Sequence, residues 1–255
     1  MGNSLGNRIL FPAPASTYNE TMPGLVIETD IMTGRKHASL FIPASTHQEK
    51  RPYLLYFHGN ACDIGSMHHE LSELADHSNT NVVAVEYPGY GVLSGPEPTA
   101  AELNAAAEFA LDYLLKRNIS PQRIVLFGRS IGSGIACKLA QSAINRGHHI
   151  GGLVLQSPYT SIHGIVRDYS SLGPWLIPDH WQNDEFLSSS ELPLLIIHGE
   201  ADEIISPAHG KRLFEVCKAT RKRLLLPPHA THNEWHLYAD VIFPVRDFVL
   251  KYLVD

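Results

Sequence analysis

One serine stands between two glycines at a place where a fold can hold a reactive nucleophile. The segment Gly128–Gly132 reads Gly-Arg-Ser-Ile-Gly, follows the apolar run Ile124–Phe127 and opens an amphipathic stretch. On such a strand-to-helix turn, the glycines on either side of the serine let the backbone of the strand and of the helix approach each other closely. The serine hydroxyl then projects above the sheet. The N-terminus of the helix would offer free N–H groups to a developing oxyanion. The pattern predicts Ser130 as the nucleophile of an acyl transfer.

A serine hydroxyl needs a general base, and the base needs an acid that orients it. Both residue types occur later in the chain, each just after a strand-like run, in the order serine, acid, histidine. The candidates are three carboxylates and two histidines: Glu200, Asp202 and Glu203, then His229 and His232. Physical reasoning from the residues alone leaves both choices open.

The elements that must position these side chains follow from the hydrophobic pattern. Eight short apolar runs have strand length: Leu25–Thr29, Ser39–Ile42, Tyr53–Phe57, Val82–Glu86, Ile124–Phe127, Leu153–Gln156, Leu194–Ile197 and Arg223–Leu226. From the third onward most are apolar on both faces, which is typical of parallel strands covered by helices on each side. The alternation of strands and helices predicts a doubly wound α/β domain with a mostly parallel, eight-stranded sheet.

Helices are predicted at four places between these runs: between Thr99 and Asn118, from Ser130 to about Arg146, from Ser206-Pro207, and from about Pro244. The first is the clearest, because Thr99 and Glu102 have the spacing of a capping box. Residues 25–255 are expected to form one domain, preceded by an extension over 1–24. The stretch 162–191 has no clear period and is predicted to be a short, irregular cap. In it, Trp175 and Trp181 would either form an apolar lid or simply pack a loop.

Four ordered motifs carry a resemblance to a known family. They are Phe57–Gly65 (Phe-His-Gly-Asn-Ala-Cys-Asp-Ile-Gly), Tyr87–Gly91 (Tyr-Pro-Gly-Tyr-Gly), Gly128–Gly132 and His198–Glu203 (His-Gly-Glu-Ala-Asp-Glu). Together they resemble an α/β-hydrolase, and most of all the Bem46-like and ABHD17 serine hydrolases. The resemblance extends from about Arg35 to the C-terminus.

The resemblance implies a role for individual residues. It makes Ser130 the nucleophile, Asp202 the acid and His232 the base, with His229 as the alternative base. It also implies that the N–H groups of Asn60 and Ile131 form the oxyanion hole, and that no metal or organic cofactor is required. Four residues are expected to border the substrate, each with ordinary packing as the alternative: His58, Cys62, Tyr159 and Trp175.

The function implied is hydrolysis of a carboxylic ester or thioester through an acyl-serine. Similarity to the ABHD17 hydrolases suggests removal of palmitoyl groups from membrane-bound proteins. One alternative is a serine peptidase, which would need acidic residues such as Asp179, Asp184 or Glu185 to hold a free amine. Another is a catalytically inactive hydrolase fold that serves as a binding module.

The amino-acid composition limits which classes of partner the protein is expected to bind and in which compartment it is expected to lie. The 255 residues include 20 Lys and Arg against 26 Asp and Glu, a net charge of −6, which argues against a nucleic-acid partner. Three scattered cysteines do not suggest a disulfide framework and favour a reducing, cytoplasmic location. Fifteen histidines include the adjacent pairs His68-His69 and His148-His149, but these lack metal-ligand spacing, so no metal site is predicted.

Membrane access is expected through the N-terminus. The chain begins Met-Gly, as N-myristoylated proteins do, although Gly6 stands where that consensus has Ser or Thr. The cysteine-rich N-terminus of the ABHD17 hydrolases is absent. An acyl chain on Gly2, aided by the apolar Ile9-Leu10-Phe11, would therefore provide a reversible, peripheral membrane contact. No apolar run reaches the roughly 18 residues of a membrane-spanning helix.

Overall fold

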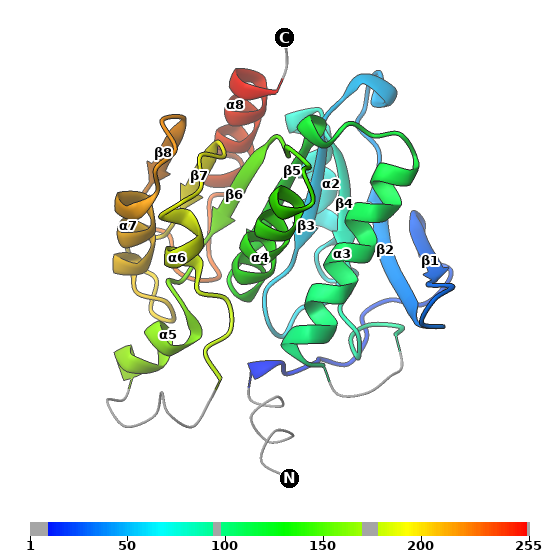
Figure 1. Cartoon of the computed structure of the whole chain (residues 1–255), viewed down its shortest axis with the longest axis horizontal. Helices are drawn as coiled ribbons and strands as arrows, with labels where there is room; N and C mark the ends of the chain where they lie inside the picture. Colours follow the sequence, from blue (N-terminus) through cyan, green and yellow to red (C-terminus); the bar gives the residue numbers. More distant parts are fainter. Residues whose placement is uncertain (1–9, 94–97, 170–177, 254–255) are drawn as a thin grey trace.

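One mixed sheet forms the centre of the molecule (Figure 1). The computed structural model describes residues 10–93, 98–169 and 178–253, and all bounds and contacts below refer to these. The strands lie in the order β1-β2-β4-β3-β5-β6-β7-β8. Their bounds are β1 Leu25–Thr29, β2 Lys36–Ile42, β3 Tyr53–Phe57, β4 Asn81–Val85, β5 Ile124–Arg129, β6 Gly152–Gln156, β7 Leu194–Ile197 and β8 Lys222–Leu225.

The direction of the strands sets where a site can form. Strand β2 is antiparallel to β1 and to β4, whereas every neighbouring pair from β4 across to β8 is parallel. The six parallel strands therefore end at the same edge of the sheet, which is where open α/β sheets bind ligands. The loops after β3, β5, β7 and β8 contain Asn60, Ser130, Asp202 and His232.

Helices cover both faces, as the apolar strands require (Figure 1). One face is covered by α3 (Ala100–Lys116), α4 (Ile131–Asn145), α6 (Asn183–Leu187) and α7 (Pro207–Val216). The other is covered by α2 (His68–Ser78), the π-helical turn η4 (Leu237–Ile242) and α8 (Phe243–Tyr252). Helix α5 (Ile162–Tyr169) follows β6.

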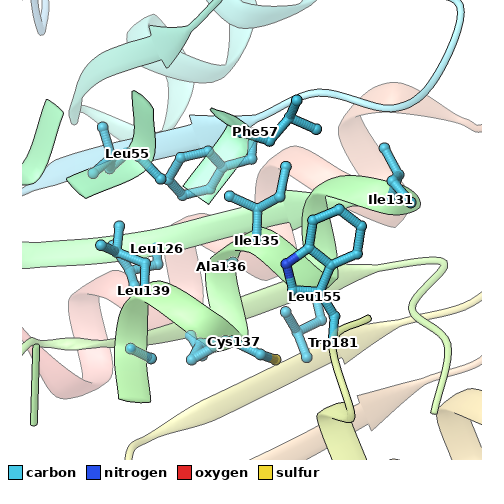
Figure 2. Packing of buried hydrophobic residues seen from close by; sticks show 14 of the residues in the cluster. Leu55, Phe57, Leu126, Ile131, Ile135, Ala136, Cys137, Leu139, Leu155 and Trp181 are labelled. Atoms are coloured by element: carbon cyan, nitrogen blue, oxygen red, sulfur yellow. The ribbon is translucent and has the colours of Figure 1, made fainter. Parts of the chain in front are cut away.

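Helix α4 anchors the larger part of the core. Its apolar side packs on β3, β5 and β6, and Trp181 lies beside it, against Gly134 (Figure 2). The labelled side chains are Leu55, Phe57, Leu126, Ile131, Ile135, Ala136, Cys137, Leu139, Leu155 and Trp181. Each fully buried aliphatic or aromatic side chain here contributes about 1.5–3 kcal/mol of transfer free energy. The start of α4, directly after Ser130, is therefore held firmly on the sheet.

The expected elements recur with small shifts at their ends, and the differences have physical causes. Thr99 caps α3 by accepting the N–H of Glu102 at 3.2 Å, but the Glu102 carboxylate pairs with Arg35 instead of closing the box. Helix α2 was not expected, since its apolar stripe is short and its N-cap, Met67, offers no capping side chain.

The stretch 162–191 is more regular than its sequence indicates. Its described part contains α5 and α6, and Phe186 and Leu187 of α6 are buried in the core that contains α4. Residue Trp175 lies outside the described residues. Residues 10–24, expected as an extension, also contact the domain, because the side chain of Phe11 is buried in the same core.

Candidate active site

The turn that carries Ser130 is strained in a way that only its surroundings can maintain. Ser130 has φ 53° and ψ −121°, a conformation that a residue with a side chain seldom adopts and that costs about 1–3 kcal/mol. Both flanking positions require glycine because other parts of the backbone pack directly against them. A Cβ on Gly128 would lie 2.3 Å from the Gly132 carbonyl oxygen, and one on Gly132 would lie 2.2 Å from that of Phe57. The backbones of β5, α4 and β3 are therefore in close contact at the turn that carries the hydroxyl.

A continuous hydrogen-bonded path connects Ser130 to a buried carboxylate. His232 Nε2 lies 3.1 Å from Ser130 Oγ, within hydrogen-bond reach. On the other side of the ring, His232 Nδ1 lies 2.9 and 3.1 Å from the two carboxylate oxygens of Asp202. The side chain of His232 is 9% exposed and that of Asp202 is fully buried. This geometry can take a proton from the hydroxyl and stabilise the imidazolium that results.

Asp202 is held in its charged form by its neighbours. Burial alone would raise the pKa of Asp202, but hydrogen bonds from His198, His232 and the Ile205 N–H outweigh it, so this pKa lies far below its usual range. The N–H groups of Ile204 and Ile205 donate to Oδ1 at 3.0 and 2.8 Å. His198, fully buried, contacts Oδ2 at 3.4 Å and the Ile205 carbonyl at 2.9 Å. The carboxylate is therefore both ionised and fixed in orientation.

The structure separates the candidates that the sequence left open. Among the three acids, Glu203 meets only the backbone N–H of His232, at 3.4 Å, and Glu200 pairs with Lys211 on the surface. Of the two histidines, His232 is the one beside Ser130. His229 instead pairs with Asp240, with Nε2 at 2.8 Å from Oδ2.

Two loops near Ser130 contain the backbone N–H groups that were expected to form an oxyanion hole. Ile131 is the first residue of α4, so its N–H has no acceptor within the helix. The loop after β3 passes directly beside Ser130, since a Cβ on Gly59 would lie 3.5 Å from Ser130 Cβ. Asn60 follows Gly59 in that loop. The start of α4 and the loop after β3 thus both lie next to Ser130.

An N-terminal strap, residues 10–18, holds the loop after β3 and was missed from the sequence. The side-chain amide of Asn60 donates to the Leu10 carbonyl at 2.7 Å. The N–H of Thr17 donates to Asp63 at 2.7 Å, and the Tyr18 hydroxyl donates to Glu86 at 2.8 Å. The strap thus contacts the loop at both ends of its Asn60–Asp63 segment.

Glu86, fully buried at the end of β4, connects the strap to the loop. It accepts from the N–H of Ile64 at 3.2 Å and lies 3.1 Å from His58 Nε2. Burial and the nearby carboxylate together raise the pKa of Tyr18, so its hydroxyl stays a donor. The sequence held one signal for this contact: Glu86 is an acidic residue at the end of a predicted strand that is otherwise apolar.

The residues expected to border the substrate are placed differently from one another. His58 and Tyr159 are fully buried, so neither is placed to touch a substrate; His58 supports the loop, and the Tyr159 hydroxyl donates to the Ile131 carbonyl at 3.3 Å. Cys62 is half-buried near Arg129, and burial raises the pKa of its thiol. Trp175 lies outside the described residues. Trp181 has a packing role and does not form an open lid, since it is buried against Gly134 of α4 and its indole N–H donates to Asn104 of α3 at 2.9 Å.

The expected membrane contact of the N-terminus needs one correction. Phe11 is only 2% exposed and packs edge-on against Trp181, so its ring belongs to the core and is not available to a bilayer. Gly2 and Ile9 lie outside the described residues. No helix in 10–93, 98–169 or 178–253 is long and apolar enough to cross a membrane.

Comparisons with known proteins agree with this architecture. The α/β hydrolase fold family matches residues 54–209. The chain is 34% identical over 213 residues to protein Bem46 of Schizosaccharomyces pombe, covering 81% of this chain and 70% of that protein. It is 32% identical over 223 residues to human α/β-hydrolase domain-containing protein 17B, covering 87% and 74%.

Solved structures show the same fold at lower identity. The esterase Est1E of Butyrivibrio proteoclasticus with bound ferulic acid has a TM-score of 0.72 and 22% identity, covering 88% of this chain and 98% of that one. A soluble variant of the Saccharomyces cerevisiae monoglyceride lipase has a TM-score of 0.66 and 16% identity, covering 92% and 98%. Its motifs, and relatives that are 32–34% identical and matched over more than two thirds of their length, show that the chain belongs to the Bem46-like and ABHD17 group of α/β-hydrolases.

Proposed function

We propose that this protein is a serine hydrolase that cleaves carboxylic esters or thioesters through an acyl-serine intermediate. The single observation that carries the proposal is the path from Asp202 through His232 to Ser130, with contacts of 2.9 and 3.1 Å. Placing these groups by chance is improbable because they come from three separate loops. The fixed imidazole, the ionised acid and the strained serine each match a role in acyl transfer.

The mechanism follows from the atoms in place. Ser130 Oγ attacks the acyl carbon while His232 Nε2 takes the hydroxyl proton and then gives it to the leaving alcohol or thiol. Asp202 holds the proton-bearing Nδ1 and stabilises the imidazolium. A water molecule, deprotonated by the same Nε2, then attacks the acyl-serine, releasing the acid and restoring the Ser130 hydroxyl.

The backbone N–H groups of Ile131 and Asn60 stabilise the oxyanion of both tetrahedral intermediates. Removing a donor of this kind lowers turnover by about 10²–10³. The strap and Glu86 matter to the reaction through this loop, because they fix where the Asn60 N–H points.

A fluorophosphonate probe tests the proposal directly. We expect wild-type protein and His229→Ala to be labelled at Ser130, and Ser130→Ala and His232→Ala to lose labelling. His229→Ala is the matched control, since it removes a histidine from the same loop without touching Ser130. Unlabelled wild type, or labelling that persists in Ser130→Ala, would refute a serine mechanism.

We further propose that the acyl substrate is carried at a membrane surface, as on a fatty-acylated protein. Similarity to ABHD17 hydrolases suggests this substrate class, and the β1–β2 turn supports it. Ile31 and Met32 in that turn are 95% and 91% exposed. The turn is well ordered, because the Asp30 carboxylate accepts the Met32 N–H at 2.9 Å and the Asp30 carbonyl accepts the Gly34 N–H at 2.7 Å.

The β1–β2 turn also lies at the edge of the sheet where the parallel strands end. Ser39 of β2 pairs with Val85, the last residue of β4, so the β1–β2 turn projects beyond the edge where Ser130 lies. A single acyl chain, as on Gly2, gives only marginal membrane binding, and a second contact is needed for stable anchoring. Ile31 and Met32 supply that second contact.

A peptidase has less support from the geometry. Of the three acids that could hold a free amine, Asp179 is already engaged, because it accepts the N–H of His163 at 2.8 Å and pairs with its ring at 3.5 Å. Asp184 Oδ1 accepts the neighbouring Glu185 N–H at 2.9 Å. Comparing aminoacyl amides with short and long acyl esters separates the two activities. Amide cleavage within about tenfold of ester cleavage, or about 1.4 kcal/mol in barrier, would favour the peptidase.

A further inference from the structure

A second cluster of ligand-type side chains lies outside the proposed site. His229, His236 and Asp240 each offer one ligand atom, and these atoms lie within 4.8 Å of one another. The rings of His229 and His236 are stacked with centroids 4.0 Å apart, and both residues are exposed to solvent. Asp240 is buried at the start of the carboxy-terminal helical segment, 7% exposed. Two solvent-exposed imidazoles thus lie close to one buried carboxylate.

The carboxylate is prepared for a further partner. Asp240 Oδ2 accepts the backbone N–H of His236 at 2.9 Å and lies 2.8 Å from His229 Nε2. A carboxylate has about four lone-pair positions on two oxygens, so these contacts leave Oδ1 for another bond. The N–H of His236 is then an outer partner that holds the ligating carboxylate in orientation, as such partners commonly do in metal sites.

We propose that His229, His236 and Asp240 form a Zn²⁺ site. Two imidazoles and one carboxylate are a donor set that suits Zn²⁺ with an open fourth position for water, whereas Ca²⁺ and Mg²⁺ prefer oxygen ligands throughout. Zn²⁺ holds such ligands at about 2.0–2.2 Å, which places ligand atoms about 3–3.5 Å apart. The ligand atoms now lie within 4.8 Å of one another, and because both rings are exposed they can turn out of their stacked arrangement toward that spacing.

The site would close the loop that contains His232. His229 lies three residues before His232 and His236 lies four after it. Inside this segment the His232 carbonyl accepts from the Trp235 indole at 3.2 Å and the Thr231 N–H donates to Glu234 at 3.1 Å. Because one ion would bind both ends of the segment, Zn²⁺ stiffens the loop without contacting Ser130. The inference stands on these three side chains and is independent of the proposed catalysis.

Calorimetric titration of the chelator-treated full chain with ZnCl₂ tests the site. We expect one equivalent to bind the wild type. His236→Gln and Asp240→Asn should each weaken binding at least as much as loss of an outer metal-site partner, about 10- to 100-fold. His236→Gln is exposed and keeps the test valid if Asp240→Asn fails to fold. The matched control is His148→Gln with His149→Gln, an adjacent histidine pair outside the proposed site, which should bind as the wild type does.

Two further readouts separate this site from others. His232→Ala should retain Zn²⁺ binding, and loss of binding there would overturn the assignment by placing the ion at Ser130. Hydrogen exchange over residues 229–236 should slow when Zn²⁺ is added to the wild type but not to His236→Gln. Equal affinity in wild type and His236→Gln, or no binding by the wild type, would overturn the proposal.

Discussion

Asp202 is selected from three neighbouring carboxylates by its backbone and not by its residue type. Glu200 and Glu203 stand within two residues of it, yet only Asp202 receives the Ile204 and Ile205 N–H groups. Those donors fix the carboxylate on the Nδ1 side of His232. The choice of acid is thus made by the turn after β7, and chemical type alone could not reveal it.

Replacing Asp202 with Asn should lower kcat for an acyl ester by about 10⁴-fold, as in serine triads generally. The amide cannot hold His232 with its proton on Nδ1, so Nε2 no longer serves as a base. Glu203→Gln is the matched control and should keep kcat close to the wild type. Steady-state kinetics measure both; a loss under tenfold in Asp202→Asn would contradict the assignment.

Acid unfolding should report the same carboxylate. The folded-state pKa of Asp202 lies below the ordinary value of about 3.9. Its ionisation therefore stabilises the protein above about pH 4, and that contribution is lost as the pH falls further. The free energy of unfolding of wild type, relative to Asp202→Asn, should decline from pH 5 to pH 2.5 in urea titrations. A difference that stays constant over this range would show that Asp202 is not held in its charged form.

At the scale of elements, the loop after β3 depends on a segment far away in the sequence. The strap at residues 10–18 reaches it through Asn60, Asp63 and Glu86. The β-strand before the loop was predictable because it is apolar on both faces. The strap was not, since its contacts use single polar groups with no period.

Tyr18→Phe should lower kcat and destabilise the protein by about 1 kcal/mol, the net value of one hydrogen bond. The ring stays in place while the bond to Glu86 is lost, so the loop that carries the Asn60 N–H becomes less fixed. Tyr238→Phe is the matched control, because its hydroxyl bonds Glu73 on the surface. Kinetics and urea unfolding measure both variants; unchanged kcat in Tyr18→Phe would show that the strap does not position the oxyanion loop.

Other elements show where sequence patterns fail. Three of the eight predicted strands have the same bounds in the structure, and the other five differ by one to three residues at one or both ends. The predicted helices also recurred, because the pattern of buried residues determines both kinds of element. Helix α2 escaped detection since it begins with His68-His69-Glu70 and no capping side chain. Helices α5 and α6 were hidden because Pro174, Pro178 and the tryptophans break the period of the stretch they share.

At the scale of the whole molecule, one edge gathers the features that the proposed function needs. The parallel strands end at one edge of the sheet, and this edge holds Ser130 and the loop after β3. The β1–β2 turn projects beyond the same edge. Sequence alone predicted the sheet and its direction, hence that edge. It did not predict the exposure of Ile31 and Met32, because an apolar pair beside a strand is ordinarily read as core.

Ile31→Ser with Met32→Ser should reduce binding to phosphatidylcholine–phosphatidylserine vesicles, because it removes the exposed apolar side chains of the turn. The control is Ile144→Ser with Leu250→Ser, which changes two exposed apolar residues, one at the end of α4 farthest from Ser130 and one in the last turns of α8. Cosedimentation of N-myristoylated protein measures both. Equal losses in the two variants, or none in either, would contradict a membrane contact at the turn.

The proposed mechanism requires that the acyl group pass through Ser130. Rapid acid quench of the enzyme with an acyl ester, followed by intact-protein and peptide mass spectrometry, measures it. We predict an adduct of one acyl group on the peptide that contains Ser130, absent from Ser130→Ala, which should also lack turnover. Hydrolysis by Ser130→Ala at the wild-type rate, or an adduct on another residue, would show that Ser130 is not the nucleophile.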